Sequence, residues 1–416
     1  MKNQSDVIII GAGAIGVCTA YYLNRAGLAV TVLEKNDVCS GCSYGNAGLV
    51  VPSHFIPLAA PGVVAKGLKW MFNPESPFYI KPFPDFRLLT WLWRFARASN
   101  HKRMQKSMPL LRDLSFASRD LYQELAEADH AGFELYTKGL LVLYKSGKGA
   151  EECRQMIRMA ETLGIEAEGV DEARIAQLDA NIRTPAKAVY FSQDAHVEPH
   201  QFVQFLSEHV QSRGVEIHTN TEVTGFETTG EMITKVRTSK GEFTAKDLVL
   251  ASGSWSSSLL NSLGTKFPAQ PGKGYSITFN GIQNIPHIPV LCTEAKVAVT
   301  PMGDRLRYGG TMELSGLDLS INQRRVNAIL TAVPEYLPAM ASNTLDGAEI
   351  WSGLRPCSPD GLPFIGRFDK WPNLIAATGH AMIGISLAPI TGKLVSEIVL
   401  NRQPSIDIGA LRVERF

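Results

Sequence analysis

The sequence predicts two interleaved units, one α/β and one α+β. An apolar run at 6–10 leads directly into a glycine-rich turn and a helical spacing, which is typical of a parallel strand followed by a covering helix. A second apolar, glycine-ended segment at 248–253 and a strand-then-helix pattern at 350–401 resemble this opening. We therefore expect one sheet assembled from separated stretches of chain, with the second unit inserted between them.

The segment 6–34 has the order of a dinucleotide-binding unit: strand, G-x-G-x-x-G, helix, strand and terminal acid. Gly11 allows the tight turn, Gly13 lets the backbone approach a pyrophosphate, and Gly16 permits close contact between helix and strand. Glu34 can accept hydrogen bonds from both hydroxyls of an adenosine ribose, which disfavours a 2′-phosphate. This unit is Rossmann-like, but it does not by itself separate FAD from NAD.

The remaining elements follow from periodicity and turn residues. We expect helices over 110–125, 153–163, 199–213 and 322–336, and strands at 139–144, 215–218, 222–226, 233–238, 243–246 and 248–253. The interval 52–109 has no single period and is rich in proline and aromatic residues. We assign 1–50, 196–262 and 345–416 to the nucleotide-binding domain, and 51–195 and 263–344 to a substrate domain.

Composition narrows the class of partner. The chain has 41 Lys and Arg against 40 Asp and Glu, and no long block of one sign that would indicate a nucleic-acid partner. No apolar run reaches the roughly 18 residues of a spanning helix. The six cysteines are too few for a disulfide framework, and the pair Cys39 and Cys42 lacks further ligands at a metal-binding spacing. We expect a cytoplasmic protein that acts on a small molecule and holds no metal.

One stretch leaves a membrane contact open. Basic and aromatic residues mix there as they do on interfacial surfaces: Lys66, Lys69, Trp70, Phe72, Trp91, Trp93, Arg94 and Arg97. The two interpretations are peripheral contact with the inner face of the cytoplasmic membrane and packing inside the substrate domain.

Motifs along the whole chain carry a family resemblance. They are 11–16, 46–48, 59–62, 69–72, 273–278, 353–356, 359–361 and 378–380. With them the chain resembles the glycine and D-amino-acid oxidase group of flavoproteins, and most closely the bacterial D-amino-acid dehydrogenase (small subunit) family. The resemblance implies a glutathione-reductase-type FAD-binding domain and a substrate domain with a mixed or antiparallel sheet and flanking helices. Gly353 stands where some relatives carry a flavin-linking cysteine, and Cys357 is displaced, so we expect non-covalent FAD.

Three segments are expected to hold the flavin. The small residues of 42–48 suit backbone that lies against a flat ring, and 379–386 precedes a helix whose N-terminal amides would stabilise reduced, anionic flavin. With the glycines and Glu34 above, the expected contacts are Ala14, Ile15, Lys35, Cys42, Ser43, Asn46, Ala47, Gly48, Leu49, Val223, Ser252, Gly253, Trp255, Gly379, His380, Ile383, Gly384 and Ile385.

Four residues are candidates for substrate contact. The resemblance implies that Arg355 binds a carboxylate, for which its planar fork is suited; the alternative is a structural ion pair. It also implies that Tyr275 lines the substrate pocket, although a core tyrosine fits as well. His54 and His380 are weaker candidates, because a lone histidine is more often structural.

The stretch 51–57 departs from the family's tyrosine-containing pattern and resembles members linked with hydroxyproline breakdown. We therefore favour cis-4-hydroxy-D-proline as the specific D-amino or imino acid, with electrons passed to a quinone or respiratory carrier. Two alternatives remain: a glycine- or sarcosine-type oxidase that uses O₂, and a flavin-holding subunit that needs a partner chain.

Overall fold

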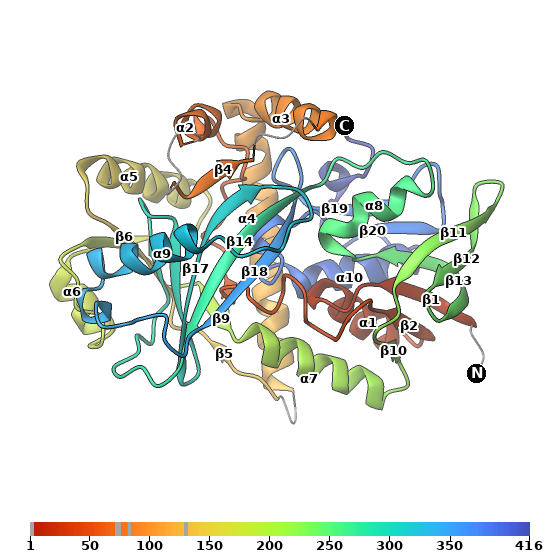
Figure 1. The fold of residues 1–416 in the computed structure, drawn as a ribbon, viewed down its shortest axis with the longest axis horizontal. Helices are drawn as coiled ribbons and strands as arrows, with labels where there is room; N and C mark the ends of the chain where they lie inside the picture. Colours follow the sequence, from red (N-terminus) through yellow and green to blue (C-terminus); the bar gives the residue numbers. More distant parts are fainter. Residues whose placement is uncertain (1–3, 71–75, 82–84, 129–131) are drawn as a thin grey trace.

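The computed structural model describes residues 4–70, 76–81, 85–128 and 132–416. Two large sheets lie side by side, as Figure 1 shows, with the strands of the N-terminal unit on the right and the larger mixed sheet on the left. Within the described part of the chain, no helix is long and apolar enough to cross a membrane.

The eight-stranded sheet is built from three stretches of chain. A parallel layer runs in the order β10, β2, β1, β13 and β20, while β11, β12 and β19 are joined to it antiparallel. Its strands are β1 (Gln4–Ile10), β2 (Val30–Leu33), β10 (Glu216–His218), β11 (Val223–Thr229), β12 (Met232–Thr238), β13 (Gly241–Leu250), β19 (Phe364–Arg367) and β20 (Leu374–Thr378). The predicted strands at 243–246 and 248–253 form one strand, β13, because β1 pairs with both segments, from Thr244 to Leu250.

The nine-stranded sheet belongs to the second unit. Its strands are β4 (Phe78–Ile80), β6 (Leu140–Tyr144), β7 (Glu168–Val170), β8 (Lys187–Phe191), β14 (Gln270–Phe279), β15 (Val290–Cys292), β16 (Val297–Met302), β17 (Arg305–Leu314) and β18 (Glu349–Cys357). A small third sheet joins β3 (Leu49–Val50), β9 (Ala195–Val197) and β5 (Leu135–Tyr136). We had assigned β18 to the nucleotide-binding domain; the structure instead pairs it with β14 along nine residues, so that boundary needs correction.

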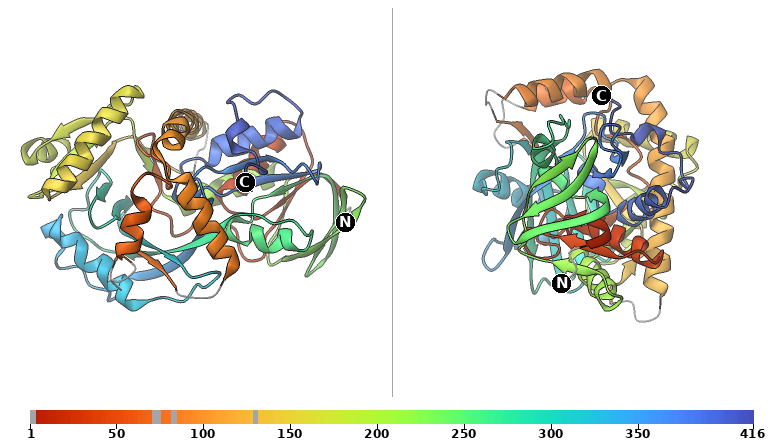
Figure 2. Two further views of the ribbon diagram at one scale, coloured as in Figure 1. Left: turned by 90° about the horizontal axis from the view of Figure 1, so that it is seen from above. Right: turned by 90° about the vertical axis from the view of Figure 1, so that its right-hand side faces the viewer.

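The helices cover both units (Figure 2). They are α1 (Ala14–Arg25), α2 (Val63–Trp70), α3 (Phe86–Ala98), α4 (His101–Glu127), α5 (Gly147–Thr162), α6 (Glu172–Leu178), α7 (Pro199–Ser212), α8 (Ser256–Asn261), α9 (Gln323–Ala332) and α10 (Ala388–Val399). Asn100 caps α4 through a hydrogen bond that its side chain accepts from the Arg103 amide, which explains why a long helix begins in this aperiodic region.

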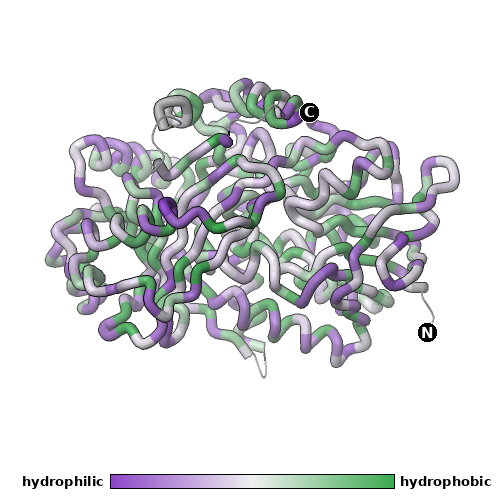
Figure 3. The backbone as a smooth tube through the Cα atoms, viewed as in Figure 1, coloured by the Kyte–Doolittle hydropathy of each residue, from purple (hydrophilic) through white to green (hydrophobic). Residues whose placement is uncertain are grey.

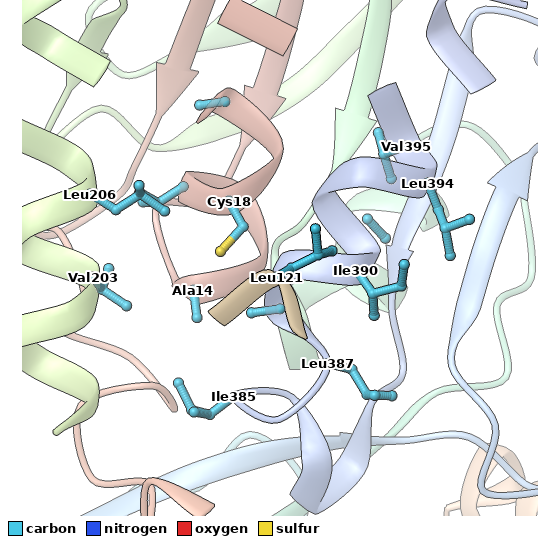
Figure 4. Close-up of a cluster of buried hydrophobic side chains, with 14 of the residues drawn as sticks. Ala14, Cys18, Leu121, Val203, Leu206, Ile385, Leu387, Ile390, Leu394 and Val395 are labelled. Atoms are coloured by element: carbon cyan, nitrogen blue, oxygen red, sulfur yellow. The ribbon is translucent and has the colours of Figure 1, made fainter. Parts of the chain in front are cut away.

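The largest core lies where α1, α4, α7 and α10 meet (Figure 4). Ala14 and Cys18 of α1 pack there with Leu121 of α4 and Ile390 of α10. The apolar face predicted at 110–125 is thus buried against the nucleotide-binding unit, although we had placed that segment in the substrate domain. The correction has a simple cause: a helix 27 residues long reaches past the sheet beside which it starts.

Candidate active site

A cleft opens at the carboxyl ends of the parallel strands, where ligands of α/β sheets bind. It encloses about 360 Å³ between the N-terminus of α1, the loop after β2, the end of β13, β18 and the segment before α10. Of the predicted cofactor contacts, those that line it are Gly11, Gly13, Ala14, Ile15, Glu34, Lys35, Cys42, Ser43, Asn46, Val223, Ser252, Gly253, Trp255, His380, Gly384 and Ile385. Gly16, Ala47, Gly48, Leu49, Gly379 and Ile383 lie outside this lining and remain predicted contacts.

The glycine motif has the backbone that close approach requires. Gly11 adopts a φ of +111°, and a Cβ there would lie 2.6 Å from the carbonyl oxygen of Ala251. A Cβ on Gly16 would overlap the carbonyl oxygen of Gly11, so only glycine lets α1 pack this tightly onto β1. Both positions therefore serve the strand-to-helix turn that brings the amides of α1 to the cleft.

Side-chain oxygens accept hydrogen bonds from backbone amides at the N-terminus of α1, beside the cleft. The Ser43 hydroxyl accepts a hydrogen bond from the Ala14 amide at 3.0 Å. Glu34 accepts one from Ala12 at 2.8 Å and another, through its second oxygen, from the Asn36 amide. These bonds fix the carboxylate at the end of β2 and leave further lone pairs for two ribose hydroxyls. The arrangement fits a dinucleotide whose pyrophosphate lies at the N-terminus of α1.

Lys35 and Trp255 also line the cleft. The Lys35 ammonium is 3.4 Å from the centre of the Trp255 ring, a cation–π contact. Burial lowers the pKa of Lys35 from its ordinary value.

The segment before α10 forms the far end of the cleft. Its backbone is held by the Tyr122 hydroxyl, which donates to the Ile385 carbonyl at 2.7 Å, and by the Ser386 hydroxyl, which accepts from the Val51 amide. His380 lines the cleft, but its Nε2 lies 2.9 Å from the Thr391 hydroxyl on α10. Burial lowers the pKa of His380 to about 3, so the ring is neutral and serves to tie the loop to the helix.

Arg355 lies on β18, above Gly274 of the neighbouring β14, where any Cβ would collide with the guanidinium. Its Nη1 donates to the Thr311 carbonyl at 2.7 Å, and within the described residues it has no acidic partner. Burial lowers its pKa, yet a guanidinium remains charged in proteins. A structural ion pair, the alternative role for Arg355, would need an acidic side chain beside it, and the described part of the chain provides none.

Thr311 adds a second feature beside this arginine. Its φ of +60° is a strained conformation for a β-branched residue, and such strain is concentrated at functional sites. Its buried hydroxyl has no hydrogen-bond partner among the described residues. An unpaired cation and an unpaired hydroxyl thus lie together on β17 and β18.

None of Arg355, Tyr275 and His54 belongs to the cleft lining, although Arg355 stands between Leu354 and Pro356, which both line it. Tyr275 is 2% exposed, and its hydroxyl donates to Glu313 at 2.9 Å. It alternates along β14 with Gly274, so it faces away from Arg355. His54 is largely buried; its Nδ1 has no partner among the described residues, and burial lowers its pKa to about 4.

Sequence reasoning missed part of the lining. Trp351, Ser352 and Leu354 of β18 and Leu319 of the loop after β17 line the cleft, as do Thr221, Ser254, Ser258 and Thr378. The only signal was the glycine at 353, over which the Trp351 ring folds. No group of three or more potential metal ligands occurs in the residues that the structure describes.

Comparisons with known proteins agree with this geometry. Residues 6–398 match the family model DAO, described as FAD dependent oxidoreductase. The chain is 32% identical to a D-amino acid dehydrogenase of Granulibacter bethesdensis, over 99% of each chain. Two solved structures share the fold: glycine oxidase from Geobacillus kaustophilus (TM-score 0.78, 23% identity, 99% of each chain) and L-proline dehydrogenase from P. horikoshii (TM-score 0.76, 19% identity, 100% of this chain and 98% of that one).

These matches confirm the predicted fold class and the predicted cofactor. The amides of α1, the fixed carboxylate of Glu34 and the loop before α10 fit FAD, and the cofactor of the matching family is FAD. The chain therefore belongs to the DAO family of FAD-dependent oxidoreductases.

Proposed function

We propose that this enzyme oxidises a D-amino acid at its α-carbon and that Arg355 binds the substrate carboxylate. The D-configuration is supported by the 32% identical relative, which is a D-amino acid dehydrogenase. The observation that carries the proposal is the Arg355 guanidinium, which is charged, partly buried and without an acidic partner in the described part of the chain. A carboxylate ligand would supply that partner in a two-bond, charge-assisted contact.

The residues act mainly by positioning. Bound FAD supplies a hydride acceptor. Arg355 holds the carboxylate, the backbone of Thr311 fixes Arg355, and the buried Thr311 hydroxyl offers a further polar contact. Trp351 and Leu319 cover the cleft and keep water away from the reacting carbon. The substrate amine reacts as the neutral form, because a protonated amine withdraws electron density from the α-carbon.

The predicted flavin contacts form part of the same proposal. The residues of the cleft lining, together with Gly16, Ala47, Gly48, Leu49, Gly379 and Ile383 around it, hold the cofactor. Cys42 lies in the lining, and burial raises the pKa of its thiol, so it remains protonated and unreactive near neutral pH.

For the specific substrate we propose cis-4-hydroxy-D-proline. The unusual segment 51–57 begins where β3 ends, and its Val51 amide bonds to Ser386 beside the cleft. His54 of this segment has a buried imidazole nitrogen without a partner among the described residues. His54 lies outside the cleft lining, so the support for this substrate is the position of segment 51–57 beside the cleft.

For the electron acceptor we propose a quinone or another respiratory carrier. The rival is an O₂-using oxidase of the glycine or sarcosine type, and a flavin-holding subunit that depends on a partner chain is a third possibility. Flavin bleaching in the isolated protein separates the third from the other two. The rate of peroxide formation on reoxidation separates the first two.

An anaerobic panel of amino acids tests the substrate. D-amino acids, and cis-4-hydroxy-D-proline above all, should bleach the flavin absorbance at least about tenfold faster than their L-enantiomers, which corresponds to about 1.4 kcal/mol in the barrier. An artificial dye should then reoxidise the flavin faster than O₂ does. Fast bleaching by sarcosine or L-proline, followed by rapid peroxide formation, would favour the oxidase.

Arg355→Lys tests the site. Lysine keeps the charge but loses the planar fork, so the carboxylate is held at one point and the α-carbon is poorly aimed. We expect KM to rise and the rate of flavin reduction to fall, each about tenfold or more, while FAD affinity stays constant. The matched control is Arg154→Lys on the exposed surface of α5. Wild-type kinetics in Arg355→Lys would place the carboxylate elsewhere.

A further inference from the structure

Helix α3 lies at the upper edge of the molecule in Figure 1 and has one face in the core. Leu88 and Trp91 are buried there, and the Trp91 indole donates to the carbonyl oxygen of Cys357 at 3.0 Å. The same cluster contains Met312 and Ala381, which follow Thr311 and His380 in the chain. The inner face of α3 therefore packs against the strands and the loop next to the site, and this packing fixes which side of the helix faces outward.

The outer face of α3 is also apolar. Phe86 is 84% exposed, while Leu89 and Trp93 are each 58% exposed. These residues are spaced three and four apart, so they form one stripe along the helix. Arg97 extends the stripe, with its guanidinium 4.8 Å from the centre of the Trp93 ring. Figure 3 shows hydrophobic and hydrophilic residues mixed along this helix, at the upper edge of the molecule.

Positive charge surrounds the stripe. Residues 61–106 include nine Lys or Arg and two acidic residues, whereas the whole chain is nearly balanced at 41 to 40. Lys81, Arg87, Arg97, Lys102, Arg103 and Lys106 are exposed, and none has an ion-pair partner within the described ranges. The acidic Asp85 is engaged at the start of α3, where its side chain caps the helix.

We propose that the outer face of α3, with the exposed cations of its flanks, docks onto an anionic phospholipid bilayer. An apolar stripe with aromatic residues, bordered by unpaired cations, matches a membrane interface, where rings enter the headgroup layer and cations meet lipid phosphates. An acidic protein would satisfy the cations but not the three large exposed side chains. The proposal does not depend on the substrate, because vesicle binding is measured without turnover.

Sedimentation of the FAD-loaded enzyme with vesicles tests this surface. Vesicles of phosphatidylglycerol and phosphatidylcholine should carry the enzyme down at low salt. Phosphatidylcholine alone, or the mixed vesicles in high salt, should bind at least about tenfold more weakly, because salt screens the exposed cations. Arg87→Gln with Arg97→Gln should weaken binding by about fivefold for each charge removed.

The apolar stripe has its own variant. Leu89→Glu with Trp93→Glu should abolish vesicle binding, while FAD content and flavin reduction by substrate stay at wild-type values, because both side chains point away from the core. The matched control is Met232→Glu, an exposed apolar residue on β12 of the nucleotide-binding sheet, which should bind vesicles normally.

Three results would overturn the proposal. They are no binding to anionic vesicles, equal binding to phosphatidylcholine alone, and vesicle binding by Leu89→Glu with Trp93→Glu that matches wild type. Concentration-dependent dimerisation that this double substitution removes, without vesicle binding by the wild type, would assign the face to a second copy of the chain instead.

Discussion

Glu34 is the residue that we propose to bind the adenosine ribose. Substitution with Arg removes both acceptors, frees the amides of Ala12 and Asn36, and places a cation where hydroxyls were to bind. We expect the FAD dissociation constant of Glu34→Arg to rise at least about tenfold, measured by quenching of flavin fluorescence on titration of apoprotein.

Glu216→Arg, an exposed residue on the neighbouring β10, is the control for a general charge effect. It should bind FAD like the wild type. Equal affinity in the Glu34 variant would mean that the ribose is bound elsewhere.

His380 predicts a pH dependence of stability. Burial lowers its pKa to about 3, while an unfolded histidine has a pKa of about 6.5. The folded state therefore binds fewer protons between these values, and the free energy of unfolding falls as pH falls, by at most about 1.4 kcal/mol per pH unit. Apoprotein of His380→Gln should show a shallower slope between pH 6.5 and 5 in urea titrations.

The identity of a residue indicates its chemistry, but it does not tell on which face of a sheet its side chain lies. The glycines and Glu34 could be predicted because their spacing alone defines a turn and a strand end. Tyr275 could not be placed, because neighbours on a strand face opposite sides and the sequence does not say which side faces the flavin. In the structure the Tyr275 side chain points toward Glu313, and the opposite face of the strand, at Gly274, lies against Arg355.

At the scale of elements, the contact between α1 and α10 depends on one close approach. A Cβ on Gly392 would lie 2.6 Å from backbone atoms of Cys18. Gly392→Ala should therefore push the helices apart and lower the free energy of unfolding by about 1–3 kcal/mol. Thermal melts of the FAD-free protein measure the loss.

Gly147→Ala is the matched control for that substitution. Gly147 begins α5, and a Cβ there would meet no atom within 4 Å. Its stability should change by less than about 1 kcal/mol. A Gly392→Ala protein as stable as this control would show that the two helices can separate without cost.

Elements with strong periodicity were predicted near their true bounds, such as α7 at 199–213. The aperiodic stretch 52–109 was not resolved into elements, because α3 is apolar on both faces and its buried Trp91 and exposed Trp93 lie two residues apart. The apolar residues of α3 extend over its buried side and its exposed side, so the sequence does not show which side packs against the core.

For the whole molecule, the cleft is lined by the first, middle and last parts of the chain, so bound FAD should raise the melting temperature.

The flavin should be released into the supernatant when the protein is denatured with acid. Gly353 lies in the cleft, and the buried thiol of Cys357 has a raised pKa, which disfavours the thiolate that would form a covalent link. Yellow colour that stays with the precipitate would contradict non-covalent binding.

Both sheets could be anticipated from turns and apolar runs, but the partition of the chain between them could not. Strand β18 is separated from β14 by about 70 residues, and long-range pairing of this kind leaves no local pattern. The domain boundaries drawn from sequence were therefore least accurate where a strand crosses from one unit to the other.

The long helix α4 has a consequence for motion. Arg112 donates to the Leu163 carbonyl at the end of α5, and Tyr122, three turns further, donates to the Ile385 carbonyl beside the cleft. Helix α4 is thus attached to both units, and a hinge motion between them would have to break one of these attachments. Access to the site must instead come from local opening of short segments such as the loop that carries Leu319. Turnover would then be gated by a flap of a few residues, with the two halves of the enzyme moving as one body.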